Sequence, residues 1–329
     1  MSNKPKFAMY WACSCGGCEI AVLNINEKIL DVDANFDVVF WPAVMDAKIK
    51  DVEAMPDKSI LLTLFNGSMR NSDNVAMARL LRQKTQILVS FGSCATEGCI
   101  PGLANLSSMK EIFDTTYQTI STDNPQNTRP QWNTPKPEGE LHIPEFFPVL
   151  RTLDEVVDVD YYMPGCPPES HQIAAVIGLV VDVLHGKAAL PPKGSVIGAG
   201  PSTVCDECPR TRNVKTIKKF VRVQDVSVID PQVCLLEQGI PCNGPATRSG
   251  CGALCPKAAA QCIGCYGPAD DVADFGARLM TAFSSVIDSK DPAEIDRILD
   301  GLPDPAGQFY RFNLAKSLLR AARPAWRNE

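Results

Sequence analysis

Several features typical of exported, membrane-spanning or nucleic-acid-binding proteins are missing from this sequence. No run of about 18 apolar residues is free of charge, so no membrane-spanning helix is expected. The N-terminal residues MSNKPKF include neither an apolar signal segment nor paired arginines, and we therefore expect a cytoplasmic protein. Acidic residues outnumber basic ones, 38 to 32, which argues against binding nucleic acid through its phosphates.

Histidine is scarce, with three residues, whereas the 329-residue chain contains fourteen cysteines. Hydrophobic residues make up 45%, which is enough to bury a core without covalent crosslinks. Disulfides are disfavoured in the cytoplasm because thiols stay reduced there. Core cysteines are usually scattered singly, but these are grouped, and grouped thiols indicate metal ligands.

The cysteines form distinct groups along the chain. Cys13, Cys15 and Cys18 lie together near the N-terminus, Cys94 and Cys99 form a pair, and Cys166 stands alone. Eight more fall within residues 205–265, namely Cys205, Cys208, Cys234, Cys242, Cys251, Cys255, Cys262 and Cys265. These eight divide into two sets of four.

Sets of four cysteines suit both zinc and iron–sulfur clusters. The Cys255-Pro256 pair and the glycine- and proline-rich surroundings favour clusters, because such loops leave backbone N–H groups free to bond to cluster sulfides. Spacing alone does not decide the metal. A zinc-stabilised interaction module with no redox role therefore remains an alternative at this point.

The first half of the chain alternates apolar strands with helices. The expected strands span residues 6–11, 36–41, 59–65, 86–91 and 159–164, and the expected helices span about 19–30, 72–84 and 169–184. This alternation indicates an α/β fold with a parallel sheet and helices on both faces. Cys15 and Cys18 follow the first strand, Cys94 the fourth and Cys166 the fifth. Because parallel strands end at one edge, we expect these four cysteines to meet there.

Composition and pattern together divide the chain into three expected regions. Residues 1–190 form the α/β domain, interrupted by an irregular proline-rich insertion at 121–148. Residues 191–268 are cysteine-rich and poor in core-forming residues, so metal ligation is expected to stabilise them. Residues 269–329 form a helical pair and a tail. The tail is basic, through Arg311, Lys316, Arg320 and Arg323, and forms either a solvated face or a contact with another subunit.

Four parts of the chain resemble the small, electron-transfer subunit of [NiFe] hydrogenases. They are Cys15-Gly16-Gly17-Cys18-Glu19, Phe91-Gly92-Ser93-Cys94-Ala95, Pro164-Gly165-Cys166-Pro167-Pro168 and the eight-cysteine region. The N-terminal part also looks like the related 20-kDa subunit of respiratory complex I. The resemblance implies a flavodoxin-like doubly wound sheet followed by an irregular iron–sulfur cluster domain.

The resemblance also implies three [4Fe-4S] clusters. The proximal set of ligands would be Cys15, Cys18, Cys94 and Cys166. The distal set would be Cys205, Cys208, Cys234 and Cys242. The medial set would be Cys251, Cys255, Cys262 and Cys265. Exported relatives often have a three-iron medial cluster with proline replacing one cysteine, so four cysteines here suggest a [4Fe-4S] cluster and agree with a cytoplasmic location.

The implied function is electron transfer by a hydrogenase subunit that has no catalytic residues of its own. The family holds its nickel–iron centre in a separate large subunit. The likeness is greatest to the cytoplasmic methyl-viologen-reducing, deazaflavin-non-reducing subgroup, which passes electrons to a [2Fe-2S] subunit and a flavin-bearing heterodisulfide reductase, as in methanogenesis-type electron bifurcation. The alternatives are a subunit of a deazaflavin-reducing hydrogenase or of a complex I-like hydrogen-evolving assembly. The long cysteine-rich C-terminus counts against the complex I-like alternative.

Four residues near the expected clusters have less certain roles in this scheme. Cys13 and Cys99 are left over, and we expect neither to be a ligand. Glu19 is either part of a proton path or a carboxylate at a helix N-terminus. His171 either bonds near the proximal cluster or bonds to backbone at the start of a helix.

Overall fold

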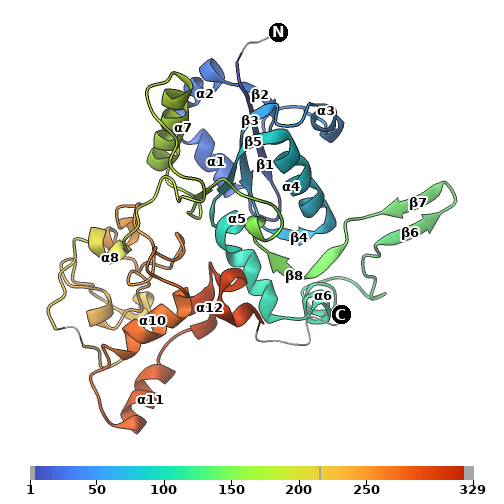
Figure 1. Cartoon of the computed structure of the whole chain (residues 1–329). Helices are drawn as coiled ribbons and strands as arrows, with labels where there is room; N and C mark the ends of the chain where they lie inside the picture. Colours follow the sequence, from blue (N-terminus) through green and yellow to red (C-terminus); the bar gives the residue numbers. More distant parts are fainter. Residues whose placement is uncertain (1–3, 215, 322–329) are drawn as a thin grey trace.

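The computed structural model describes residues 4–214 and 216–321 (Figure 1). Its main sheet has five parallel strands in the order β2-β1-β3-β5-β9. The strands are β1 Lys6–Trp11, β2 Asp37–Phe40, β3 Ile60–Asn66, β5 Thr85–Phe91 and β9 Tyr161–Met163. All five predicted strands are confirmed to within two residues. The order is that of a flavodoxin-like sheet, with the first strand between the second and third.

Helices cover both faces of this sheet (Figure 1). They are α1 Gly17–Leu23, α2 Ile29–Asn35, α3 Ile49–Glu53, α4 Ser72–Lys84, α5 Ser93–Glu97 and α7 Ser170–Leu184. The predicted helices at 72–84 and 169–184 are confirmed. The single helix predicted at 19–30 is wrong, because α1 ends at Leu23 and Asn26 adopts a left-handed φ of 56° before α2 begins. Asparagine tolerates this conformation better than most residues.

Each face of the sheet has its own hydrophobic core. On one face, Val22 of α1 and Ile173 of α7 pack with Met9 and Leu64. On the other face, α4 contributes Val75, Ala78 and Leu81, which pack with strand residues such as Phe65 and Leu88. Among the described residues, no helix has both the length and the apolar character needed to cross a membrane.

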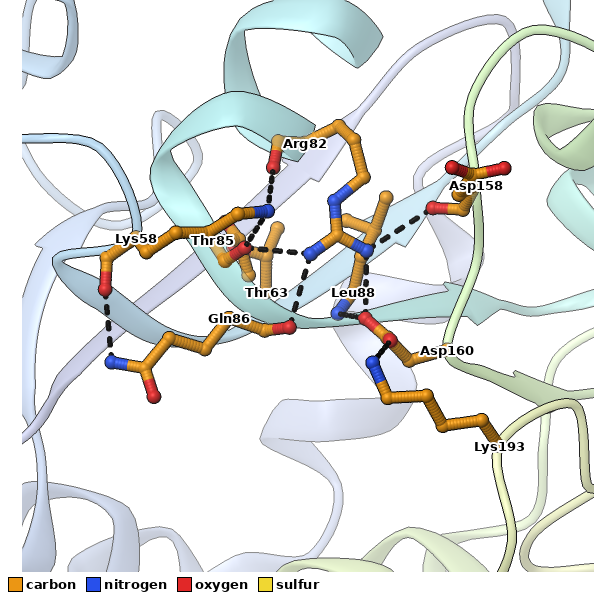
Figure 2. A network of polar contacts seen from close by, with 9 residues as sticks. All are labelled: Lys58, Thr63, Arg82, Thr85, Gln86, Leu88, Asp158, Asp160 and Lys193. Atoms are coloured by element: carbon orange, nitrogen blue, oxygen red, sulfur yellow. Dashed lines mark hydrogen bonds and ion pairs between the residues drawn. The ribbon is translucent and has the colours of Figure 1, made fainter.

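An ionic network around the buried Asp160 holds together the amino-terminal edge of the sheet (Figure 2). The carboxylate of Asp160, just before β9, accepts hydrogen bonds from Arg82 Nη1 at 2.7 Å, Lys193 Nζ at 2.6 Å and the Leu88 backbone N–H at 2.8 Å. Lys58 Nζ donates to the carbonyls of Arg82 and Thr85, both at 3.0 Å. A cleft of about 730 Å³ lies over this network. The network is at the opposite end of the strands from the cysteines, so we assign it a structural role.

The proline-rich insertion is more ordered than expected. After α6 Met109–Tyr117, strands β6 Asn133–Lys136 and β7 Gly139–His142 form an antiparallel hairpin that projects from the body (Figure 1). Strand β8 Phe146–Arg151 pairs with β4 Met69–Asn71 in a second small sheet. The prediction of a wholly irregular segment is therefore wrong, although none of these strands joins the main sheet.

The cysteine-rich segment contains little regular structure. Its α-helices are the short α8 Val204–Glu207 and α9 Leu254–Lys257. The helices that follow are α10 Phe275–Ser284, α11 Pro292–Asp300 and α12 Pro305–Tyr310, which confirms the predicted helical pair. Ile217 and Phe220 pack with Phe275 and Phe283, so α10 covers part of the cysteine-rich segment.

The C-terminal tail returns to the flavodoxin-like part of the chain. The Cys99 backbone N–H donates to the Phe312 carbonyl at 3.0 Å. Lys316 pairs with Asp154 at 2.8 Å, and Arg320 pairs with Glu155. These cations are therefore not simply a solvated face, because they bind carboxylates of the same chain. Arg323, the last of the predicted basic residues, lies outside the described residues.

Candidate metal centres

The structure brings the proximal set together at the carboxyl edge of the sheet. Cys15 and Cys18 follow β1, Cys94 lies in the first turn of α5 after β5, and Cys166 follows β9. Burial raises the pKa of Cys18, and the neighbouring sulfurs of Cys94, Cys166 and Cys15 raise it further. The four thiols are thus close enough to repel one another as thiolates. A cationic group among them would relieve this repulsion.

A glycine makes this close approach possible. Gly92, between β5 and α5, has a φ of 80°, and a β-carbon there would lie 2.4 Å from Cys18 Sγ. No larger residue fits this position without displacing the sulfur. The Ser93 backbone N–H also donates to the Gly165 carbonyl at 2.8 Å. This bond fixes the loop containing Cys94 against the loop containing Cys166.

The two cysteines that were expected not to be ligands lie beside this set. The buried Cys99 thiol donates to Cys166 Sγ across 3.5 Å. Hydrogen bonding to Cys166 and Cys94, together with burial, raises the pKa of Cys99, and the same bond lowers the pKa of Cys166. Cys99 therefore holds its proton while Cys166 becomes the better thiolate. Cys13 forms an antiparallel bridge with Ser68, and burial is the main cause of its raised pKa.

The distal set lies around a cavity of about 280 Å³, lined in part by Cys205, Cys234 and Cys242. Burial and then the nearby Cys242 raise the pKa of Cys205 to about 12, with further contributions from Cys234 and Cys208. Burial likewise raises the pKa of Cys242 to about 11. These thiols share one space and would be costly to ionise without a cationic group.

Most of the medial set gathers next to the proximal set. Burial, followed by Cys251, Cys255 and Cys166, raises the pKa of Cys265 to about 12. Cys262 lies between the medial and distal sets. Its pKa is raised by burial and then by Cys242, and more weakly by Cys265. Among the described residues, no three His, Cys, Asp or Glu side chains are positioned to hold a single metal ion.

The three sets lie in a row, and cysteines of neighbouring sets lie close together at each of the two boundaries. At the boundary between the proximal and medial sets, Cys166 lies close enough to Cys265 to raise its pKa. At the other boundary, the Cys262 backbone N–H donates to Cys242 Sγ at 3.4 Å. The order along the row is therefore proximal, medial, distal.

Two charged residues that sequence reasoning missed hold the cysteine loops in place. Buried Arg210 donates through Nε to the Pro256 carbonyl at 2.8 Å and through Nη1 to the carbonyls of Asp230 at 2.6 Å and Val233 at 2.9 Å. It thereby connects the loops that contain Cys208, Cys234 and Cys255. The only signal in the sequence is a basic residue two positions after Cys208, and nothing there identifies its backbone partners.

Glu207 acts on the neighbouring loop. Its carboxylate accepts hydrogen bonds from the backbone N–H groups of Gly250 at 2.7 Å and Gly252 at 3.0 Å, on either side of Cys251. Because Glu207 lies between Cys205 and Cys208, it joins a distal loop to a medial loop. Charge-assisted bonds of this kind are stronger than neutral ones.

Near the cysteines, Glu19 is buried and Glu97 has a pKa raised by burial, whereas His171 is exposed. Glu19 is 3% exposed and lies in the first turn of α1, which agrees with a carboxylate at a helix N-terminus, and burial raises its pKa. Burial raises the pKa of Glu97, in α5, to about 7, although Lys316 and Arg248 oppose this shift. His171 is exposed at the start of α7.

Comparison with known proteins identifies the family. The family described as "NADH ubiquinone oxidoreductase, 20 Kd subunit" matches residues 15–180. The iron–sulfur subunit of an F420-non-reducing hydrogenase from Archaeoglobus profundus is 40% identical over 321 residues, covering 95% of this chain and 97% of that protein. The chain belongs to this family of hydrogenase subunits. The corresponding vhu subunit of the F420-non-reducing hydrogenase from Methanococcus voltae is 35% identical and covers 97% of this chain and 98% of that protein.

A solved structure agrees with this fold. One chain of the oxidised [NiFeSe] hydrogenase from Desulfovibrio vulgaris Hildenborough aligns with a TM-score of 0.52 at 16% identity, covering 83% of this chain and 96% of that chain. Membership of the family of F420-non-reducing hydrogenase subunits makes this chain part of an oxidoreductase. The resemblance to hydrogenase small subunits and to the complex I 20-kDa subunit is confirmed.

Proposed function

We propose that this chain conducts electrons from hydrogen oxidation through three [4Fe-4S] clusters held by the proximal, medial and distal sets. The observation that supports this most is the row of cysteines, in which Cys265 adjoins Cys166 and Cys262 adjoins Cys242. A row of this kind suits transfer of single electrons between neighbouring clusters. It also agrees with the name of the Archaeoglobus profundus relative, which is an iron–sulfur subunit.

The residues present fit such clusters. The cavity beside Cys205, Cys234 and Cys242 offers space between thiols, and burial raises the pKa of Cys205 and Cys242, so their thiolates would be stabilised by a cationic group there. When bound, the clusters would supply one-electron redox chemistry. The chain's own contribution is to place the thiols, to direct backbone N–H groups at sulfur and to exclude water. Burial of Cys18, Cys94, Cys242 and Cys262 provides that exclusion.

The proximal end is suited to a large partner subunit that holds a nickel–iron centre. Cys15 is exposed there, and the nearby apolar side chains of Trp11, Ile20 and Leu23 are 47%, 57% and 43% exposed. Downstream, we propose a [2Fe-2S] subunit and a heterodisulfide-reductase-like flavoprotein. The relatives are named as F420-non-reducing, which favours this route over a deazaflavin acceptor. Because all fourteen thiols are free, we propose a reducing, cytoplasmic location.

Anaerobic co-expression with the large subunit of the same hydrogenase tests the proposal. The complex should be brown and contain about twelve irons, with matching acid-labile sulfide, in this chain. It should reduce viologen dyes with hydrogen, whereas the isolated chain should not take up hydrogen. Stoichiometric zinc without sulfide would contradict the proposal and establish a structural module instead.

A further inference from the structure

The side chain of Gln172 lies at the junction between the flavodoxin-like part and the cysteine-rich segment. It projects from the first turn of α7 and is 4% exposed. Its Oε1 accepts hydrogen bonds from the Tyr266 hydroxyl and from the Glu169 backbone N–H, the latter at 3.1 Å. The same Glu169 N–H also lies 2.9 Å from the Tyr266 oxygen and donates to it. The tyrosine proton is therefore directed at Gln172, and these two donors fix which end of the amide is oxygen.

The amide nitrogen consequently faces the other way, toward the medial loop. A β-carbon on Gly250 would lie 2.7 Å from Gln172 Nε2, and Gly250 directly precedes Cys251. Nε2 is buried and has no hydrogen-bond partner among the described residues. Leaving a buried polar group unpaired costs about 1–3 kcal/mol, so an acceptor is expected at this position.

Two cysteines of the medial set lie close to Tyr266. Tyr266 directly follows Cys265 in the chain, and the sulfurs of Cys265 and Cys251 both contribute to its raised pKa, of which burial is the main cause. A bound cluster would provide the acceptor that Nε2 does not find among the described protein atoms. Its sulfides and its cysteine sulfurs both accept N–H hydrogen bonds.

We infer that Gln172 donates an N–H···S hydrogen bond to the medial cluster and thereby raises its reduction potential. This inference rests on the proposed function, since it needs a cluster at Cys251, Cys255, Cys262 and Cys265. Reduction adds negative charge to the cluster, and a hydrogen-bond donor stabilises that charge. Gln172 acts from the helix that follows the proximal Cys166, so one short segment adjoins two successive clusters.

The test is an EPR-monitored redox titration of the holo complex. In Q172L the equilibrium constant for reducing the medial cluster should fall about tenfold. For a one-electron step this lowers the reduction potential by 59 mV. The proximal and distal clusters should keep their potentials. H171A alters the neighbouring, exposed residue of the same helix and should match the wild type. Q172E keeps both bonds to its remaining oxygen but replaces the donor with a second oxygen, so its medial potential should fall further.

Each outcome decides between the inference and its alternatives. An unchanged medial potential in Q172L with full iron content would overturn the inference and indicate that a buried water or carbonyl accepts the bond. Should Q172L fail to fold, the nearly isosteric Q172E provides the test. A wild-type medial potential in Q172E would also overturn the inference. A wild-type complex with no medial cluster signal would refute the proposed function rather than the role of Gln172.

Discussion

The thiol of Cys99 lies 3.5 Å from the sulfur of Cys166 and donates to it. The bond holds the proton on Cys99 and lowers the pKa of Cys166, so two neighbouring cysteines take different roles. One is suited to ligation and the other to supporting the ligand. This relationship leads to a pair of opposite predictions.

Replacing Cys99 by alanine should leave the iron content of the complex unchanged. The proximal cluster should become harder to reduce, because Cys166 loses a hydrogen-bond donor. Iron and sulfide analysis with a redox titration measures both effects, and C13A serves as the control. Loss of about four irons in C99A would identify Cys99 as a ligand and contradict its assignment.

Replacing Cys166 by alanine should have the opposite effect. The complex should lose about four irons and its hydrogen-linked dye reduction, while the two clusters of the cysteine-rich segment remain visible by EPR. Because the proposed path begins at the proximal cluster, loss of that cluster should interrupt the path at its first step. Unchanged turnover in C166A would show that the proximal set is wrongly assigned.

Replacing Arg210 by methionine should destabilise the cysteine-rich segment. The substitution removes donors to three carbonyls, those of Pro256, Asp230 and Val233, in a buried position. We expect a loss of about 3 kcal/mol and reduced iron in the medial and distal clusters. Denaturant unfolding with iron analysis measures both. R222M, at an exposed arginine of the same region, should behave as wild type, and equal effects of the two would argue against a specific role.

Asp160 should stabilise the sheet in a pH-dependent way. Burial acts to raise its pKa, but Lys193, Arg82 and the Leu88 N–H outweigh burial and lower it below the usual value of 3.8. The stabilisation is therefore complete above about pH 4 and is lost as pH falls through the lowered pKa. D160N should cost about 3 kcal/mol at pH 7 by denaturant unfolding. D158N, at an exposed carboxylate two residues earlier, is the control and should change little.

Glu97 should give the opposite pH dependence. Burial raises its pKa from 4.5 to about 7, so the folded protein holds the proton more tightly than the unfolded chain. Its favourable contribution is complete below pH 4.5 and disappears as pH rises through 7, a change of about 3 kcal/mol. Thermal unfolding of the complex at pH 5 and pH 8 should show this dependence in the wild type and a flatter response in E97Q. Identical profiles would refute it.

The sequence predicts the parts of this fold that depend on local pattern. Apolar runs separated by helices were enough to locate the five strands, and the rule that parallel strands end at one edge was enough to bring Cys15, Cys94 and Cys166 together. The break at Asn26 was missed, because apolar spacing continues through it. The prolines argue correctly against a helix or a central strand in the insertion, but they do not exclude a hairpin outside the main sheet, such as β6–β7.

The supporting residues could not be predicted for a different reason. Arg210 and Gln172 act through backbone and side-chain partners 20 to 94 positions away in the sequence. Such contacts exist only once the loops have been brought together. Residue type alone does not distinguish them from Arg222 or from other glutamines. Spacing therefore indicates the ligands of a cluster well and its surroundings poorly.

The packing of Phe312 has a consequence for how the protein is made. This residue lies in the same hydrophobic cluster as Cys94 and Cys99, and its carbonyl accepts the Cys99 N–H. Phe312 thus completes the wall around two thiols that are synthesised much earlier. A ribosome-bound chain cannot make this contact until residue 312 has left the ribosome. Under the proposed function, we therefore expect iron to reach the proximal set before, or while, the segment around Phe312 packs against it.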